Sequence, residues 1–91
     1  MYILDITIRA KKHLDFWKIS GQKNILNKIN ALFEELEEHP RTGTGKPEQL
    51  KGDFSGFWSR KIDKKNRIIY KVDDENVVVL VVAAKGHYEF K

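Results

Sequence analysis

The second half of the sequence holds a carboxylate, several cations and an imidazole. The carboxylate is Glu48, in the segment 45–51, and the imidazole is His87, near the end of the sequence. Cleavage of RNA by its own 2′-hydroxyl needs a base for the hydroxyl proton, cations for the charge on the phosphorane, and an acid for the leaving 5′-oxygen. The residue types for metal-independent RNA cleavage are therefore all present.

Within this scheme Glu48 is the natural base and His87 the natural acid. Four cations and two aromatic side chains complete the set: Lys46, Lys51, Arg60, Arg67, Trp58 and Tyr88. The aromatic rings offer surfaces on which an unpaired base can stack. Each residue also has an ordinary structural interpretation. Glu48 could be a loop carboxylate paired with a neighbouring cation, and the arginines could be strand cations that discourage edge aggregation. The spacing of these residues alone does not distinguish a catalytic role from a structural one.

The charge of the chain is concentrated in the same half. The net charge is +4, and residues 1–39 contribute none of it because six basic and six acidic side chains cancel there. Residues 40–91 carry eleven basic and seven acidic side chains. This asymmetry suggests a polyanionic partner, although a mildly basic domain without any nucleic-acid role would have the same composition.

Length and composition limit the remaining possibilities. The 91 residues predict one small domain, 1–91, and the absence of cysteine excludes disulfides and thiolate zinc sites. The longest apolar run, 77–84, has the length of a strand and is too short to span a membrane. The N-terminus lacks the basic segment of a signal peptide. We therefore expect a cytoplasmic protein with no membrane association. Its three scattered histidines predict no metal and no cofactor.

The first half predicts a strand and two helices. Residues 2–6 alternate like a short strand, and Thr7 can cap the helix that follows. That helix has a core stripe of Ala10, Leu14 and Trp17 and stops at Gly21. A second helix is predicted over 22–38, with this apolar face: Ile25, Leu26, Ile29, Leu32, Phe33 and Leu36. The acidic run 34–38 lies on its polar side and is interpreted as a solvated surface.

The second half predicts a sheet, so the fold class is α+β. Residues 57–62, 67–72 and 77–83 are rich in β-branched and aromatic side chains, and two polar connectors, 63–66 and 73–76, separate them. This pattern is typical of an antiparallel meander.

A register follows if 63–66 is the whole first connector, because Ile62 then pairs with Arg67 and Arg60 with Ile69. Arg60 and Arg67 would be diagonal neighbours on one face of the sheet, free to receive a ligand. That face would also hold Trp58, Ile62, Ile69 and Lys71. The opposite face, with Phe57, Ser59, Ile68, Tyr70 and Val72, is the better candidate for packing on the helices. A bulge of one residue would exchange the faces.

Four segments carry a resemblance to a known family. They are Gly45-Lys46-Pro47-Glu48-x-Leu50-Lys51, Ser55-Gly56-Phe57-Trp58-Ser59-Arg60, Arg67-x-x-Tyr70 and His87-Tyr88. Together they resemble the signature of the YoeB/Txe toxins, a branch of the RelE superfamily of toxin–antitoxin systems. The agreement covers nearly the whole chain. It implies a RelE/ParE-like fold of barnase-type ribonuclease architecture, and an endoribonuclease that enters the ribosomal A site, cuts mRNA and is held inactive by an antitoxin.

The resemblance also implies roles for individual residues. Glu48 would be the general base and His87 the general acid, while Arg67 would stabilise the phosphorane. Lys51 and Arg60 would bind phosphate, and Tyr88 would help to position the substrate. The chain departs from the family pattern before His87, where Lys85 and Gly86 replace an arginine and a bulkier residue. Lysine cannot reproduce the bidentate contact of arginine with phosphate.

The leading hypothesis is therefore a ribosome-dependent mRNA endonuclease that inhibits translation. Its expected partners are a YefM/Axe/Phd-like antitoxin, the ribosome with its mRNA, and a second copy of the chain in a homodimer. The alternative is a protein without catalysis, either an RNA-binding module or a ParE-like inhibitor of DNA gyrase on the same fold. A third possibility is an inactive toxin that functions mainly as a corepressor with its antitoxin.

Overall fold

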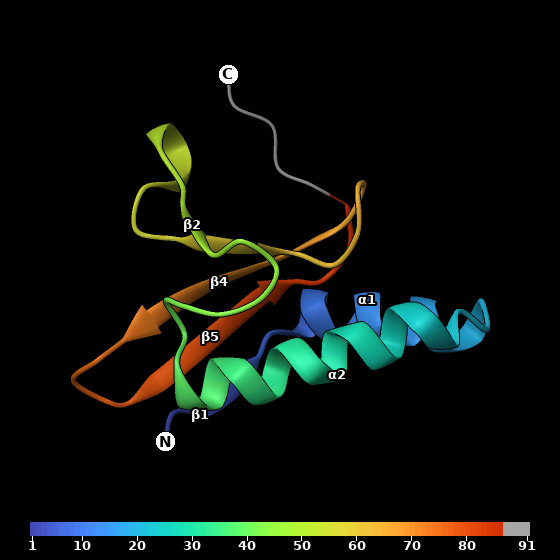
Figure 1. The fold of residues 1–91 in the computed structure, drawn as a ribbon, viewed down its shortest axis with the longest axis horizontal. Coiled ribbons are helices and arrows are strands. Elements are labelled where there is room, and N and C mark those ends of the chain that lie inside the picture. The colour runs from blue at the N-terminus through green and yellow to red at the C-terminus, as the bar shows by residue number, and fades with distance from the viewer. Residues whose placement is uncertain (87–91) are drawn as a thin grey trace.

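Two helices cover one face of a five-stranded sheet in the computed structural model, which describes residues 1–86 (Figure 1). The helices are α1 (Ile8–Ile19) and α2 (Lys23–Glu38). The strands are β1 (Ile3–Ile6), β2 (Glu48–Gln49), β3 (Trp58–Lys61), β4 (Arg67–Asp73) and β5 (Val78–Ala83), with a short 3-10 turn, η1 (Gly52–Phe54), between β2 and β3. We call the face against the helices the inner face and the opposite one the outer face. This arrangement confirms the α+β prediction.

The helices form where the sequence pattern places them. The Ala10 amide donates to the Thr7 hydroxyl at 3.2 Å and caps α1. Gly21, with a φ of 71°, adopts the left-handed conformation between the helices that glycine tolerates best. The predicted apolar faces of both helices join one hydrophobic core with Ile68, Tyr70 and the inner side of β5. Within residues 1–86, no helix combines the length and apolar character needed to cross a membrane.

The sheet contains two features that the sequence did not predict. Its order is β1-β5-β4-β3-β2, so the N-terminal strand runs parallel to the last one. The predicted meander of β3, β4 and β5 is confirmed. The short β2, which carries Glu48, adds a further antiparallel edge next to β3. The pairing of β1 with β5 joins segments far apart in the chain, whereas β2 and β3 are separated only by residues 50–57.

The predicted register between β3 and β4 is wrong by one residue. Lys61 pairs with Arg67, and Arg60 pairs with Ile68. Asp63 accepts hydrogen bonds from the amides of Lys65 and Asn66, both at 2.8 Å. This turn includes Ile62 in the connector, which therefore has five residues.

The one-residue difference exchanges the faces of β3. Three residues predicted for the ligand face, Trp58, Arg60 and Ile62, lie on the inner face. Ser59 lies with Arg67 and Ile69 on the outer face instead. Arg60 and Arg67 therefore do not share a face, because side chains alternate between faces along a strand.

Candidate active site

Glu48 and Arg67 are both neighbours of Ser59 on the outer face of the sheet. Glu48 in β2 is the register partner of Ser59 in β3, and the Arg67 guanidinium donates from Nη1 to Ser59 Oγ at 3.4 Å. Glu48 is exposed and Arg67 is half-buried. A guanidinium carries five N–H donors, so one contact with Ser59 leaves most of them available for phosphate oxygens. The fold thus brings a predicted base and a predicted phosphate ligand to either side of one serine.

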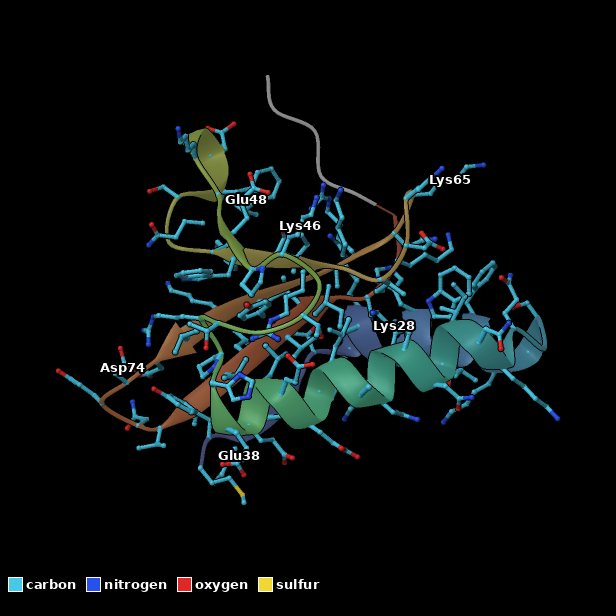
Figure 2. The ribbon with its side chains drawn as sticks, in the orientation of Figure 1. Lys28, Glu38, Lys46, Glu48, Lys65 and Asp74 are labelled. Atoms are coloured by element: carbon cyan, nitrogen blue, oxygen red, sulfur yellow. The ribbon has the colours of Figure 1, made fainter. Side chains whose placement is uncertain are left out.

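Backbone hydrogen bonds on both sides of Glu48 fix its position. The Lys61 amide donates to the Gly45 carbonyl at 2.6 Å, and the Leu50 amide donates to the Phe57 carbonyl at 2.9 Å. Between these contacts Lys46 adopts a φ of 50°, which is uncommon for a residue with a side chain. Figure 2 shows Lys46 and Glu48 on the side of the sheet away from α2. Lys46 is exposed, so its ammonium can serve the same ligand as Glu48.

The loop that leads into β2 is held by Arg60, which is 0% exposed. Arg60 Nη2 donates to the carbonyls of His39 and Thr42, both at 2.7 Å, and Nη1 donates to Glu35 Oε1 at 2.8 Å. A fully buried guanidinium with these partners has no surface for a substrate. We therefore assign Arg60 to positioning the loop, in place of the substrate-binding role that the sequence predicted.

Glu35 completes this anchor, although it was predicted to lie on a solvated surface. Its carboxylate accepts hydrogen bonds from the Thr44 amide and hydroxyl as well as from Arg60. Desolvation by itself would raise the pKa of Glu35, but these hydrogen bonds outweigh it and lower the pKa below its ordinary value. A Cβ at Gly43 would lie 2.2 Å from Glu35 Oε1, so glycine is required where the loop approaches the carboxylate.

Tyr70, the tyrosine of the Arg67-x-x-Tyr70 segment, also holds the loop that leads into β2. Its hydroxyl donates to the Pro40 carbonyl at 2.6 Å and accepts from Arg60 Nε at 3.3 Å. Burial is the main cause of a raised pKa of Tyr70, so the neutral hydroxyl is the form that makes these contacts. Two residues of the signature, Arg60 and Tyr70, therefore hold the loop, while Glu48 and Arg67 face outward.

The backbone that leads to His87 is bound next to Arg67. The Arg67 amide donates to the Gly86 carbonyl at 2.8 Å, and the Gly86 amide donates to Asn66 Oδ1 at 2.8 Å. Further back, Ala84 receives a hydrogen bond from Trp17 Nε1 at its carbonyl and donates its amide to His13 Nδ1. The chain is thus anchored on both sides of Lys85. His87 and Tyr88 lie outside the described residues, and their predicted roles stay predictions.

Two other predicted substrate residues lie in different surroundings. Lys51 is exposed and immediately precedes η1. Trp58 is half-buried and packs against the core on the inner face, away from Glu48, so it is not placed as a stacking surface beside the base. The sequence did not identify Ser59 and Asn66 as site residues. Ser59 accepts a hydrogen bond from Arg67, and Asn66 accepts one from the Gly86 amide. The only signal for Asn66 was its position directly before Arg67. Among residues 1–86, no group of three His, Asp or Glu side chains is arranged to hold a metal ion.

Comparisons with known proteins identify the family to which this chain belongs. A family model for the YoeB-like toxin of bacterial type II toxin-antitoxin systems matches residues 7–88. Toxin YoeB from Streptomyces coelicolor is 44% identical over 72 residues, which cover 79% of this chain and 82% of that protein. A solved YoeB/ParE toxin from Agrobacterium tumefaciens is 34% identical with a TM-score of 0.88, over 94% of this chain and 99% of that one.

A third relative comes from Staphylococcus aureus, where YoeB has been solved as a dimer and in a complex with YefM. The chain in the YoeB-YefM complex is 28% identical to this one, with a TM-score of 0.82 over 97% of this chain and 99% of that chain. The YoeB dimer gives the same identity and a TM-score of 0.83, over 96% and 98% of the two chains. The family model and the close relatives cover most of the sequence, including the segments that carry Glu48 and Arg67. This chain therefore belongs to the YoeB-like toxins of bacterial type II toxin–antitoxin systems.

Proposed function

We propose that this YoeB-type toxin is an endoribonuclease that cuts mRNA in the ribosomal A site. The observation that carries the proposal is the placement of Glu48 and Arg67 on an open face, next to the bound backbone that leads to His87. A pure binding surface has no need for a carboxylate beside the cation that receives the phosphate. The toxin would act in the cytoplasm, where translating ribosomes supply the substrate.

The proposed reaction is a transesterification without a metal ion. Glu48 takes the proton of the 2′-hydroxyl, whose oxygen then forms a bond to phosphorus. Arg67 stabilises the charge on the phosphorane, and Lys46 and Lys51 bind neighbouring phosphate oxygens. The bond from phosphorus to the 5′-oxygen breaks as His87 gives that oxygen a proton. The products are a 2′,3′-cyclic phosphate and a 5′-hydroxyl, and Tyr88 would help to position the substrate.

The proposed partners follow from the relatives and from charge. YoeB from Staphylococcus aureus forms a complex with YefM and also a dimer. By analogy, a YefM-like antitoxin would hold this toxin inactive, and a homodimer would be a further assembly. The net charge of +4, all of it in residues 40–91, favours docking on ribosomal RNA.

The test is a translation reaction in which mRNA is mapped at nucleotide resolution after the toxin is added. We expect cuts only in ribosome-bound mRNA, with cyclic phosphate and 5′-hydroxyl ends. A parallel supercoiling assay with DNA gyrase examines the alternative, because one solved relative is described as a YoeB/ParE toxin. Inhibited supercoiling with intact mRNA would contradict the proposal, and so would arrested translation that leaves no cut ends.

Asn66→Ala is expected to lower the rate of mRNA cleavage by about tenfold or more. The change removes the acceptor for the Gly86 amide, and small displacements of a catalytic group have effects of about this size. Asn76→Ala is the matched control, because the Asn76 side-chain amide donates to Asp73 in the other hairpin connector as that of Asn66 donates to Asp63. Cleavage rates of the two variants on programmed ribosomes make the comparison. Equal rates would show that the contact with Gly86 does not position the site.

A further inference from the structure

A pocket of ≈ 250 Å³ lies beside the candidate active site, at the end of β5. Three basic side chains line it, Arg9 and His13 from α1 and Lys85 from the segment after β5. Phe54, Ile69 and Val82 form an apolar wall. Arg9 and Lys85 are exposed and His13 is half-buried. The pocket thus combines positive charge with apolar surface, in a volume smaller than the sites of drug-sized ligands.

The pocket exists because β1 is shorter than β5. Strand β1 ends at Ile6, opposite Val81, and the start of α1 takes its place beside the last residues of β5. The Thr7 amide donates to the Val81 carbonyl, and its hydroxyl donates to the Val82 carbonyl. Two side chains of α1, Arg9 and His13, therefore reach the edge of the sheet where a strand would otherwise lie.

The polar groups of the pocket are hydrogen-bond donors. The Ala84 amide donates to His13 Nδ1 at 3.0 Å, so neutral His13 carries its proton on Nε2. Desolvation, followed by the charges of Lys85 and Arg9, lowers the pKa of His13 and keeps the imidazole neutral at pH 7. The Lys85 ammonium lies 4.5 Å from the centre of the Phe16 ring, which fixes its position. Among residues 1–86 no carboxylate lines the pocket, so a ligand that carries negative charge or acceptors suits it.

The pocket and the candidate base lie on one row of the sheet. Glu48 pairs with Ser59, Ser59 with Ile69, and Ile69 with Ala83. Ile69 is part of the pocket wall and lies two strands from Glu48, a separation of roughly 10 Å. An RNA strand whose cleaved phosphate sits between Glu48 and Arg67 can therefore place its neighbouring nucleotide in the pocket.

We propose that the pocket is a subsite for the nucleotide adjacent to the cleaved phosphate, an inference that rests on the proposed function. Arg9 and Lys85 hold its phosphate, and the His13 Nε2–H group donates to an acceptor on the nucleotide. The base lies against the apolar wall of Phe54, Ile69 and Val82. The chain departs from the family pattern at Lys85 and Gly86. In the proposed subsite Lys85 does not act alone, because α1 supplies Arg9 as a second cation.

The subsite is tested by nuclear magnetic resonance with a trinucleotide RNA whose 2′-O-methyl riboses prevent cleavage. We expect the side-chain resonances of Arg9 and His13 and the Phe54 ring to shift as the trinucleotide is added to millimolar concentration. Shifts confined to Glu48 and Arg67 would overturn the assignment. Inorganic phosphate is titrated in parallel, and an equal affinity for phosphate alone would also overturn it, because the base would then contribute nothing.

A pair of double variants separates the pocket from general attraction to RNA. Arg9→Ala/Lys85→Ala is expected to weaken trinucleotide binding about tenfold and to reduce the salt dependence by the equivalent of one or two phosphate contacts, about 0.7 each in slope. Lys12→Ala/Lys18→Ala removes the same charge from exposed positions on the same helix and should change affinity about twofold. Equal losses in the two variants would overturn the subsite. Ribosome-dependent cleavage by the wild type is measured separately, so a failure of the proposed function is recognised independently of the pocket.

Discussion

Arg60→Ala is expected to lower the free energy of unfolding by about 3–5 kcal/mol, because it removes a fully buried side chain, breaks its ion pair with the partly buried Glu35 and leaves a cavity. The side chain has no exposed surface and binds Glu35 together with three backbone carbonyls, those of His39, Thr42 and Thr44. Small domains have a total stability of about 5–15 kcal/mol. The variant should therefore be close to unfolding, and what remains folded should lose the position of the loop before Glu48.

Urea denaturation of four variants measures this effect: Arg60→Ala, Lys61→Ala, Glu35→Ala and the double variant of Glu35 and Arg60. Lys61→Ala is the matched control, since Lys61 is the next residue of β3 but lies on the outer face, and we expect a loss below about 1 kcal/mol. Glu35→Ala combined with Arg60→Ala should cost less than the sum of the two single changes, because either single change already breaks the ion pair between them. Additive losses would show that the two side chains act independently. A stable Arg60→Ala variant would return Arg60 to the set of candidate substrate ligands.

The helices could be predicted because their signals are local. Thr7, the stripe of Ala10, Leu14 and Trp17, and the apolar period of α2 each act within a few turns, and the structure confirms them. The antiparallel meander could be predicted for the same reason, since its strands follow one another. Parallel pairing of β1 with β5 joins residues more than seventy positions apart, and no local pattern in either strand specifies that partner.

The register of β3 and β4 depended on a single residue of connector length. Four polar residues, 63–66, marked the connector in the sequence, but the turn around Asp63 also takes in Ile62. Because side chains alternate along a strand, this residue moves Arg60 from the ligand face to the core. An arginine flanked by strand residues carries no sign of burial in its own sequence. Glu35 is the ionic partner of Arg60. Because we interpreted Glu35 as a surface acid, we did not expect it to pair with a buried arginine.

The residues of the candidate site show the same difference. Some could be identified from the local sequence, and others only from the contacts that the folded chain makes. Glu48 and Arg67 were predicted from residue type and family resemblance, and the fold places them on one face. Ser59 and Asn66 acquire their importance only when β2, β3 and the chain after β5 come together. Arg9 and His13 reach the pocket because α1 follows β1 directly and β1 pairs with β5, a pairing that no motif in the sequence specifies.

Glu48→Gln is expected to lower the rate of ribosome-dependent mRNA cleavage by about 10²–10⁴-fold, the usual contribution of a positioned general base. The amide keeps the size of the side chain but cannot take a proton from the 2′-hydroxyl. Glu48 is exposed and its strand is held by backbone hydrogen bonds, so the stability of the variant should stay within about 0.5 kcal/mol of the wild type. Single-turnover cleavage on programmed ribosomes measures the chemical step.

Glu38→Gln is the matched control for this change. Glu38 is exposed at the end of α2, on the opposite side of the molecule from Glu48, and the substitution removes the same charge (Figure 2). Its cleavage rate should equal that of the wild type. A fall of similar size in both variants would indicate that net charge governs docking on the ribosome. Full activity of Glu48→Gln would instead remove Glu48 as the base, and would leave Arg67 and the residues beyond Gly86 to account for the chemistry.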